Sequence, residues 1–352
     1  MRFELTDDQQ AIQRTAKEFL ASRYPAEEVR RLALEDERGF TDEQWQAVVE
    51  LGWPALVVAE DDGGLGLGVV ELAVLQEQLG YALAPTPLLS TVATALAISA
   101  AGSPEQRAEW LPGLAEGERR GTVAPVPASL DFVDHVLTGT LEAVPDAAGA
   151  DLLVAPTGHD QLSVVDLHGD GVRVEPVEGL DPTRRLSTIT LDGAPSTPLG
   201  ATDGRALARA RDVITVAVAA ESVGVAQRAM EMAVEHARDR HQFGRPIGVF
   251  QAVSHACAQM LLEVEGARSA VMFAAWALDA SPEEAALAAA MAKAYASDAG
   301  WRVPAAALQV LGGIGFTWEH DLHFWLKRGR ANAAAWGDGR WHRARVADLI
   351  GL

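Results

Sequence analysis

The feature that most constrains the fold of this chain is the alanine-rich sequence that runs from about residue 203 to the end. Two stretches within it, 249–280 and 282–311, are long enough to form the helices of a bundle. Upstream of them, apolar residues recur at spacings of three and four and give one apolar stripe, formed by Val223, Ala226, Met230, Ala233 and Ala237. Because alanine lets helices approach closely, this block favours a four-helix bundle or a helical oligomer interface.

Between residues 121 and 199 the pattern changes to short runs in which apolar and polar residues alternate. Proline, glycine and aspartate residues separate these runs, as expected for strands that are joined by turns. The runs are 136–141, 152–155, 162–165, 172–174 and 186–191. The block is therefore expected to be a small antiparallel barrel or sandwich between two helical blocks.

Residues 1–120 are expected to be helical. Thr6 precedes two acidic residues suited to a first helical turn, and Thr41 is an N-cap with a capping box for a helix that ends at Gly52. Further helices are expected at 69–80 and 104–114. The chain is thus predicted to be an α+β protein with three domains: an N-terminal helical domain (1–120), a middle β-barrel or sandwich domain (121–199) and a C-terminal four-helix bundle (200–352).

Composition argues against several classes of function. The 352 residues carry 49 Asp and Glu against 29 Lys and Arg, a formal net charge of −20, which disfavours nucleic acid or an anionic membrane as the main partner. Cys257 is the only cysteine, so no internal disulfide is expected and a cytoplasmic location is the natural expectation. We expect no signal peptide, and the uncharged stretch 79–104 contains proline and glycine, which favours a buried helix over a membrane span.

Residues 240–251 form the first candidate binding segment. Gly244 and Pro246 should break the helix there and present Arg240 and Phe243 at an exposed corner. An arginine at such a corner can grip a phosphate through paired N–H donors, and an aromatic ring can pack on a planar group. Taken alone, the segment is explained more simply as a corner between helices whose arginine pairs with a carboxylate.

A second segment, Gln309-Val-Leu-Gly-Gly-Ile-Gly-Phe316, ends the last long helix. Glycines at this point remove side chains and let a ligand approach the backbone N–H groups. A glycine helix stop explains the same residues when the segment is considered by itself.

Together the two segments resemble the acyl-CoA dehydrogenases, in which Arg-x-x-Phe-Gly-x-Pro-Ile-x-x-Phe-Gln is followed about sixty residues later by Gln-x-x-Gly-Gly-x-Gly-Phe. The order of helical, β and helical blocks fits the same family, so the resemblance covers the whole chain. It implies a flavoprotein with FAD at a subunit interface, in which the two motifs contact the ADP half of a flavin held mainly by a neighbouring subunit. In this sequence the motif residues are Arg240, Phe243, Gln251, Gln309, Gly312 and Gly313.

The family reaction, as the resemblance implies it, removes the α-proton of an acyl-CoA thioester and needs a carboxylate as base. In most members this base is a Glu near the C-terminus, and the matching position here is Trp336, followed by Gly337. Other members place it early in the first bundle helix, where this chain has Ile214. Neither side chain can accept the proton, so we expect no catalytic residue in this chain. Asp212 and Asp338 each lie two residues away and remain alternatives if the register is displaced.

The middle block also departs from the family. The family's Thr-Glu-Pro-Gly-x-Gly-Ser-Asp-like turn and Trp-Ile-Thr-Asn-like strand, which hold the flavin ring, correspond here to 123–129 and 139–144, and the block contains no tryptophan. Asp338 and Arg340 stand where flavin-contacting Thr and Gln residues would be. The half of the site that grips a neighbour's ADP is therefore kept, and the half needed for a complete local site is lost.

This selective loss resembles the base-lacking chain of actinobacterial α2β2 acyl-CoA dehydrogenases of steroid side-chain breakdown. The resemblance implies a non-catalytic subunit that completes the FAD site of a Glu-bearing partner chain. An acyl-CoA substrate and an electron-transfer flavoprotein or similar acceptor are implied with it. Two alternatives stay open: a self-sufficient homo-oligomeric dehydrogenase with a displaced Asp base, and a flavin-free structural homologue.

Other residues suggest sites less strongly. His320, Asp321 and His323 are close in sequence but lack a further ligand cluster, so we expect a packing or surface role and no metal site. The basic residues of 327–330 and 340–345 can meet either cofactor phosphates or acidic neighbours across an interface. The tryptophans between 318 and 341 are expected to be core or interface anchors.

Overall fold

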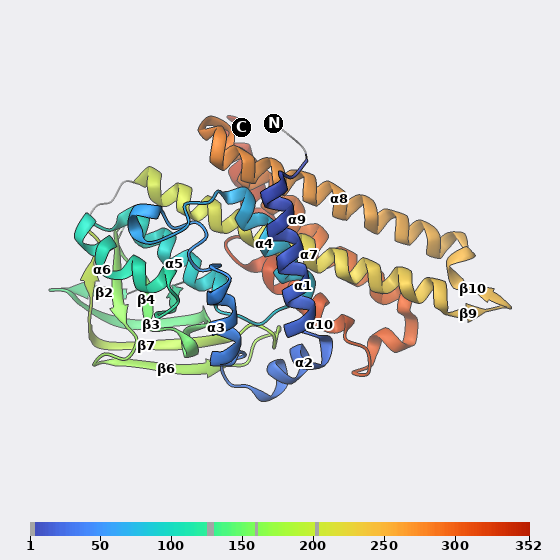
Figure 1. Ribbon diagram of the computed structural model, residues 1–352, viewed down its shortest axis with the longest axis horizontal. Helices are drawn as coiled ribbons and strands as arrows, with labels where there is room; N and C mark the ends of the chain where they lie inside the picture. Colours follow the sequence, from blue (N-terminus) through green and yellow to red (C-terminus); the bar gives the residue numbers. More distant parts are fainter. Residues whose placement is uncertain (1–3, 125–129, 159–160, 201–203) are drawn as a thin grey trace. The chain divides into compact units, whose positions relative to one another are not determined.

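The computed structural model describes residues 4–124, 130–158, 161–200 and 204–352 (Figure 1). The chain forms two compact units, each assembled from separate segments. The first unit comprises Met1–Arg30, Val69–Ala84 and Thr215–Leu352, and the second comprises Arg31–Gly68 and Pro85–Ile214. The three-domain division expected from the sequence stays a prediction.

The first unit is helical apart from one short hairpin, within the described residues. Its helices are α1 (Asp7–Arg23), α4 (Val69–Ala82), α8 (Gln251–Ala280), α9 (Pro282–Leu311), α10 (Leu322–Ala334) and α11 (Gly339–Leu349). Helices α2 (Ala26–Glu35) and α7 (Gly204–Asp239) contribute residues to both units. Helix α9 packs against α8, α10 and α11, and α4 packs against α1 and α8. The predicted apolar stripe of α7 lies in the core, at 0 to 7% exposure, which confirms it.

Glycine allows the closest helix contacts of this unit. A Cβ atom at Gly224 of α7 would lie 1.9 Å from the carbonyl oxygen of Glu77 on α4, and one at Gly80 of α4 would lie 2.1 Å from the carbonyl oxygen of Glu221. The backbones of α4 and α7 therefore touch at two points where any side chain would collide.

The second unit contains helices and two four-stranded sheets, counted over the described residues. The sheet orders are β1-β4-β5-β8 and β2-β3-β7-β6, and all pairings are antiparallel except β1 with β4, which is parallel. The strands are β1 (Gly121–Val123), β2 (Leu130–Val133), β3 (Val136–Pro145), β4 (Leu152–Gly158), β5 (Gln161–Asp166), β6 (Val172–Val177), β7 (Leu186–Pro195) and β8 (Thr197–Pro198). The five predicted runs lie in β3 to β7, whereas a wholly antiparallel block was a wrong expectation because β1 pairs beside β4 in the same direction.

Strand β4 lies between two apolar clusters because its side chains alternate in direction. Leu152 and Val154 pack in a cluster with α5 (Leu88–Ala101) and α6 (Pro104–Ala115). Leu153 and Ala155 pack in a second cluster with residues of the other sheet. The second unit is thus a sheet-on-sheet sandwich with helices against one face.

Helix starts follow the predicted capping signals. Both Thr6 and the N-cap of α3 (Asp42–Glu50), Thr41, form complete capping boxes in which the hydroxyl accepts the backbone N–H three residues on. The uncharged stretch 79–104 is not one helix, because α4 ends at Ala82 and α5 begins after Pro87. Helix α5 is mostly buried, as expected.

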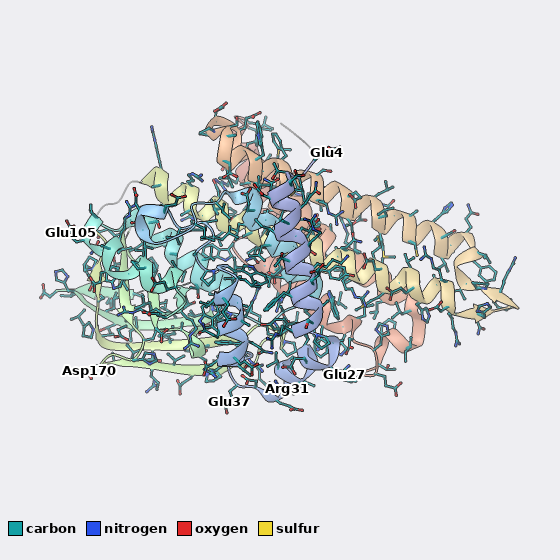
Figure 2. All side chains as sticks on the ribbon, in the orientation of Figure 1. Glu4, Glu27, Arg31, Glu37, Glu105 and Asp170 are labelled. Atoms are coloured by element: carbon teal, nitrogen blue, oxygen red, sulfur yellow. The ribbon has the colours of Figure 1, made fainter. Side chains whose placement is uncertain are left out.

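The fold is α+β, as predicted. One described helix, α7, is long and apolar enough to cross a membrane, but 89% of its most apolar window is buried inside the protein, which is typical of a core helix. The acidic excess lies largely on the outside, where Glu27, Glu37, Glu105 and Asp170 project from the ribbon (Figure 2). Carboxylates in water carry no desolvation cost, so the net charge does not oppose packing of the core.

Candidate functional site

The first predicted segment forms a hairpin rather than a plain helix corner. Helix α7 ends at Asp239, and two short strands, β9 (His241–Gln242) and β10 (Arg245–Pro246), pair in antiparallel fashion before a 3-10 turn leads into α8 (Figure 1). Phe243 and Gly244 join the strands in the left-handed region, with φ of 54° and 79°. Both positions of a two-residue turn of this kind need positive φ, which explains the glycine.

The hairpin presents the predicted side chains to solvent. Phe243 is 89% exposed, and its ring meets the ring of Phe250 edge-on at 5.9 Å. Arg240 and Gln251 are exposed as well. The backbone of Arg240 is fixed, because its N–H donates to the carbonyl of His236 and its own carbonyl accepts from Ile247. The guanidinium of Arg240 therefore extends from a rigid point.

The second predicted segment leaves its backbone open. Gln309 is exposed in the last turn of α9, and Gly312 caps that helix with φ 64° and ψ −141°, a conformation that favours glycine. A 3-10 turn, η4 (Gly312–Phe316), follows. A Cβ atom at Gly312 or Gly313 would meet no heavy atom of the described chain within 4 Å. The space in front of the two glycines is open.

The register of α8 and α9 brings the two segments to the same end of a helical pair. Arg302 of α9 donates to Glu263 of α8 at 3.1 Å, and a single residue, Ser281, joins the two helices, so they run antiparallel. Twelve residues back from Glu263 the chain reaches Gln251, the first residue of α8, and nine residues on from Arg302 it reaches Leu311, the last residue of α9. Because both stretches are α-helical and run away from the Arg302–Glu263 contact in the same direction, Gln251 and the glycine turn lie at the same end of the pair.

Neither predicted base position carries a base. Trp336 is partly buried in the turn between α10 and α11, with a left-handed φ of 57°. Ile214 is 3% exposed within α7. The nearby Asp338 is the N-cap of α11, where its carboxylate accepts the N–H of Trp341 at 2.7 Å. This hydrogen bond lowers the pKa of Asp338, which makes the carboxylate a weaker base. The other alternative, Asp212, is buried in α7.

The segments expected to lack flavin-ring contacts are only partly described. Residues 125–129 of the stretch 123–129 lie outside the described residues. The stretch 139–144 forms part of β3, where Leu141 and Val144 are buried in the cluster between the two sheets. This strand segment therefore serves the core of the second unit.

The histidine segment 320–323 packs within the first unit. The Arg30 guanidinium donates to Asp321 at 3.0 Å, and the ring of His323 lies 4.5 Å from that of Trp318 and 4.1 Å from that of Phe324. Burial lowers the pKa of His323 to about 4. The described residues contain no group of three or more His, Cys, Asp or Glu side chains placed to hold a metal ion. Of the tryptophans, Trp325 is buried, whereas Trp318 and Trp341 are 62% and 46% exposed.

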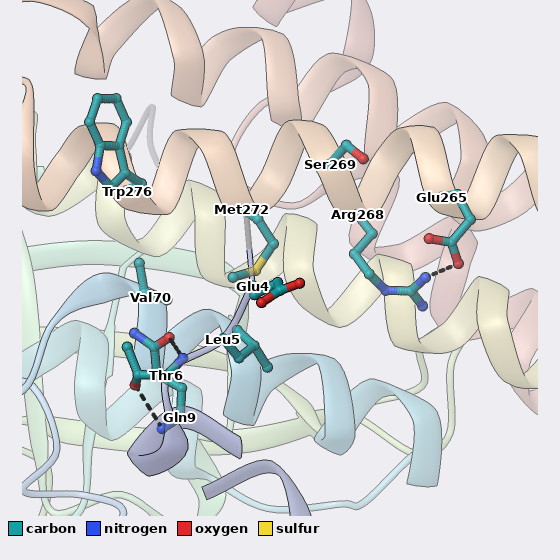
Figure 3. Close-up of a pocket in the computed structure, with 10 residues that line it drawn as sticks. All are labelled: Glu4, Leu5, Thr6, Gln9, Val70, Glu265, Arg268, Ser269, Met272 and Trp276. Carbon is teal, nitrogen blue, oxygen red and sulfur yellow. Dashed lines mark hydrogen bonds and ion pairs between the residues drawn. The ribbon is translucent and has the colours of Figure 1, made fainter. Parts of the chain in front are cut away.

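A cavity of about 500 Å³ in the first unit lies apart from these segments (Figure 3). It is lined by the N-terminal segment, the start of α4 and one face of α8, through Glu4, Leu5, Thr6, Gln9, Val70, Glu265, Arg268, Ser269, Met272 and Trp276. The guanidinium of Arg268 donates to Glu77 Oε1 and to Gln227 Oε1, each at 3.0 Å. The six predicted cofactor residues are absent from the described residues that line it, so this cavity is not the predicted site.

Sequence reasoning missed one residue beside the Trp336 turn. Lys293 of α9 is completely buried and donates to the carbonyl oxygen of Gly337 at 2.8 Å. Burial lowers the pKa of its ammonium group to about 8. The sequence contains one indication of this role, because a lysine on the buried face of an alanine-rich helix must find hydrogen-bond partners inside the protein.

Comparison with known proteins extends these observations. Residues 6–118 match the family model "Acyl-CoA dehydrogenase, N-terminal domain", and residues 207–350 match "Acyl-CoA dehydrogenase, C-terminal domain". The chain is 34% identical over 328 residues to acyl-CoA dehydrogenase IpdE2 of Mycolicibacterium smegmatis, covering 93% of this chain and 94% of that protein.

Two solved structures are similar over nearly their whole length. One is a variant of the Tcur3481-Tcur3483 steroid ACAD, with 30% identity, a TM-score of 0.87 and coverage of 98% of both chains. The other is the ChsE4-ChsE5 complex of Mycobacterium tuberculosis, with 27% identity, a TM-score of 0.90 and coverage of 99% of both chains. Together with the arrangement of the two motifs at one end of α8 and α9, these matches assign the chain: it belongs to the acyl-CoA dehydrogenase family.

Proposed function

We propose that this chain is the non-catalytic subunit of a heteromeric, FAD-dependent acyl-CoA dehydrogenase. Its partner is a second acyl-CoA dehydrogenase chain that carries the catalytic Glu, in an α2β2 assembly. The proposal is supported by the similar solved structures, which are described as the Tcur3481-Tcur3483 steroid ACAD and as the ChsE4-ChsE5 complex. By the same similarity, we propose a steroid-type acyl-CoA thioester as substrate and an electron-transfer flavoprotein or similar protein as acceptor.

The observation that carries the proposal is the turn between α10 and α11. Abstraction of an α-proton needs an accessible carboxylate near the thioester. At the matching position this chain has the indole of Trp336, which has no basic lone pair. The carboxylate of Asp338, two residues further along the chain, accepts the N–H of Trp341 as a helix cap. If the partner chain supplies the base, a member of the family can lack a carboxylate at this position and still take part in the reaction.

The other half of the proposal concerns cofactor binding. The exposed guanidinium of Arg240 suits a phosphate, and the open backbone at Gly312 and Gly313 leaves room for the dinucleotide to approach. These features fit the ADP end of FAD, with Phe243, Gln251 and Gln309 as further contacts. FAD, when bound, supplies the acceptor for the hydride that leaves the β-carbon of the substrate. The residues of this chain bind and orient its ADP end.

The test is co-expression with a Glu-bearing homologue, followed by purification and an absorbance spectrum. We expect a yellow complex that reduces a dye with acyl-CoA, and little flavin on this chain when it is purified alone. Arg240→Ala should weaken FAD binding by the complex roughly ten- to hundredfold, the effect of one charge-assisted hydrogen bond. Arg238→Ala, an exposed arginine two residues earlier, is the matched control and should retain the flavin.

Two results would contradict the proposal. A homo-oligomer of this chain that carries stoichiometric flavin and reduces dye with acyl-CoA would show that it is self-sufficient. A complex whose flavin content is the same in the Arg240→Ala and Arg238→Ala variants would favour a flavin-free structural homologue.

A further inference from the structure

A buried cation joins helices α9 and α10 to the Trp336 turn. Lys293 of α9 is fully buried, and its Nζ donates to Ser297 Oγ at 2.9 Å, to the carbonyl of Asn332 on α10 at 3.1 Å and to the carbonyl of Gly337 at 2.8 Å. An ammonium group has three N–H donors, and these three oxygens use all of them. The contact with Gly337 ties the turn directly to the core of the bundle.

A second buried donor holds the adjacent carbonyl. His342 of α11 is fully buried, and its Nε2 lies 2.9 Å from the carbonyl oxygen of Trp336. Because a carbonyl oxygen only accepts, Nε2 carries the proton in this contact. Two consecutive carbonyls of the turn, those of Trp336 and Gly337, are therefore each fixed by a buried side chain.

The backbone of the turn needs such support. Trp336 and Gly337 have φ of 57° and 91°, so two successive residues lie in the left-handed region. For a bulky residue such as tryptophan this conformation is strained, because its Cβ crowds the carbonyl oxygen that follows. At Gly337 a Cβ atom would also lie 2.8 Å from the indole of Trp341, so no other residue fits there without a shift. Strained backbone of this kind persists only where the surroundings fix it.

We propose that Lys293 and His342 are positioning residues that lock the register of the turn 336–338. With the turn locked, the indole of Trp336 keeps its place and Asp338 stays at the cap of α11. The turn is thereby prevented from shifting by two residues, a shift that would bring the carboxylate of Asp338 to the place of Trp336, where most family members carry the base. Only this last consequence rests on the proposed function; the lock itself rests on the contacts of the two side chains.

The experiment follows the turn through the indole of Trp336. The full chain, which has nine tryptophans, is labelled with 5-fluorotryptophan and purified both alone and with an unlabelled Glu-bearing homologue; the ¹⁹F signal of Trp336 is assigned with Trp336→Phe. Lys293→Met should shift or broaden the Trp336 signal beyond its wild-type line width and leave the signals of distant tryptophans in place. Ser297→Ala removes one of the three acceptors of Lys293 but leaves those on α10 and in the turn. This variant should leave the Trp336 signal where it is.

Lys327→Met is the matched control, because Lys327 lies 4.6 Å from the ring of Trp318 and not at the turn. It should move the signal of Trp318 and leave that of Trp336. If Lys293→Met does not fold, His342 gives a second test. His342→Leu removes the donor to the Trp336 carbonyl and should move the Trp336 signal. His342→Gln keeps a side-chain N–H, so its Trp336 signal should lie closer to the wild-type position than that of His342→Leu.

An unchanged Trp336 signal in both Lys293→Met and His342→Leu would overturn the proposal. Equal movement of all nine signals would also overturn it, because it would reveal a general structural role. Flavin content and dye reduction are measured on the same samples as separate readouts. Failure of the heteromeric function would appear in those two readouts, whereas the lock is tested by the ¹⁹F signals alone.

Discussion

Arg328 of α10 and Glu221 of α7 form an ion pair inside the first unit: Nη1 donates to Oε1 at 2.6 Å, and the two side chains are only 2% and 3% exposed. The sequence places Arg328 in a basic run that could meet a cofactor or a partner. The structure directs this arginine inward instead. A buried charge is tolerated only when it is paired and hydrogen-bonded, so each of the two residues depends on the other.

Removing one partner of this pair should be strongly destabilising. Arg328→Met should lower the free energy of unfolding by about 3–5 kcal/mol, because the buried carboxylate of Glu221 loses its guanidinium. Urea unfolding followed by circular dichroism measures the change. The double variant Arg328→Met/Glu221→Gln should regain part of the loss. A cost below about 1 kcal/mol for Arg328→Met, the range of an exposed pair, would refute this prediction.

Two glycine substitutions, one at the contact of α4 and α7 and one in the open glycine turn, should differ in their effect on stability. Alanine normally stabilises a helix relative to glycine, yet Gly224→Ala would place a methyl group 1.9 Å from the carbonyl oxygen of Glu77. The helices must then separate, at an expected cost of about 1–3 kcal/mol or more. Gly313→Ala has open space around it among the described residues and should change stability by no more than about 0.5 kcal/mol. Thermal unfolding of both variants compares them directly.

Acid should weaken the protein in part through His342. Burial lowers the pKa of its imidazole from the ordinary 6.5 to about 4, so the folded state holds the proton less readily than the unfolded state. The stability linked to the neutral ring is therefore fully present above pH 6.5 and is lost as the pH falls through 4. His342→Gln removes this titration.

The measurement is the urea midpoint of wild type and His342→Gln at pH 7.0 and pH 4.5. The variant should be less stable at pH 7.0, and the gap should narrow at pH 4.5. The pKa of His323 is also lowered to about 4, but this histidine is present in both proteins and its contribution cancels. A gap of constant size at the two pH values would show that His342 is not the group responsible.

Asp338 should be dispensable for proton abstraction. Asparagine caps helices as well as aspartate does, so Asp338→Asn should keep the bond to the N–H of Trp341 and the stability of α11. The dehydrogenase rate of the assembled complex should not change. Loss of a catalytic base would lower the rate roughly 10²- to 10⁴-fold. Such a drop, measured by dye reduction with acyl-CoA, would instead support the self-sufficient enzyme with a displaced base.

Local signals in the sequence were sufficient for much of the fold. The capping box of Thr41 was predicted because the N-cap and its N3 partner are only three residues apart, and Thr6, expected only as a helix start, forms the same box. The bounds 282–311 of α9 were predicted because Pro282 and Gly312 mark its two ends. The six cofactor residues could be proposed only because the two motifs resemble those of the acyl-CoA dehydrogenases, and the structure places them in two exposed segments at one end of α8 and α9. Their contact with FAD stays a prediction.

Long-range pairing was beyond the reach of the sequence. The parallel pairing of β1 with β4 joins segments about thirty residues apart, and nothing in three residues of sequence specifies it. The hairpin at 241–246 was expected as a plain corner, because only backbone geometry shows that Phe243 and Gly244 both have positive φ.

By itself, the sequence determined the α+β fold and the two motifs that resemble the acyl-CoA dehydrogenase family, whereas the binding of a dinucleotide by these motifs and the lack of a base stay predictions. Tertiary structure alone decided that the turn carrying Trp336 is tied down by Lys293 and His342. The physical reason is that the role of a buried lysine depends on which oxygen atoms accept its hydrogen bonds. Two of these are backbone carbonyls, at Asn332 and Gly337, which every residue type possesses and which no sequence pattern marks.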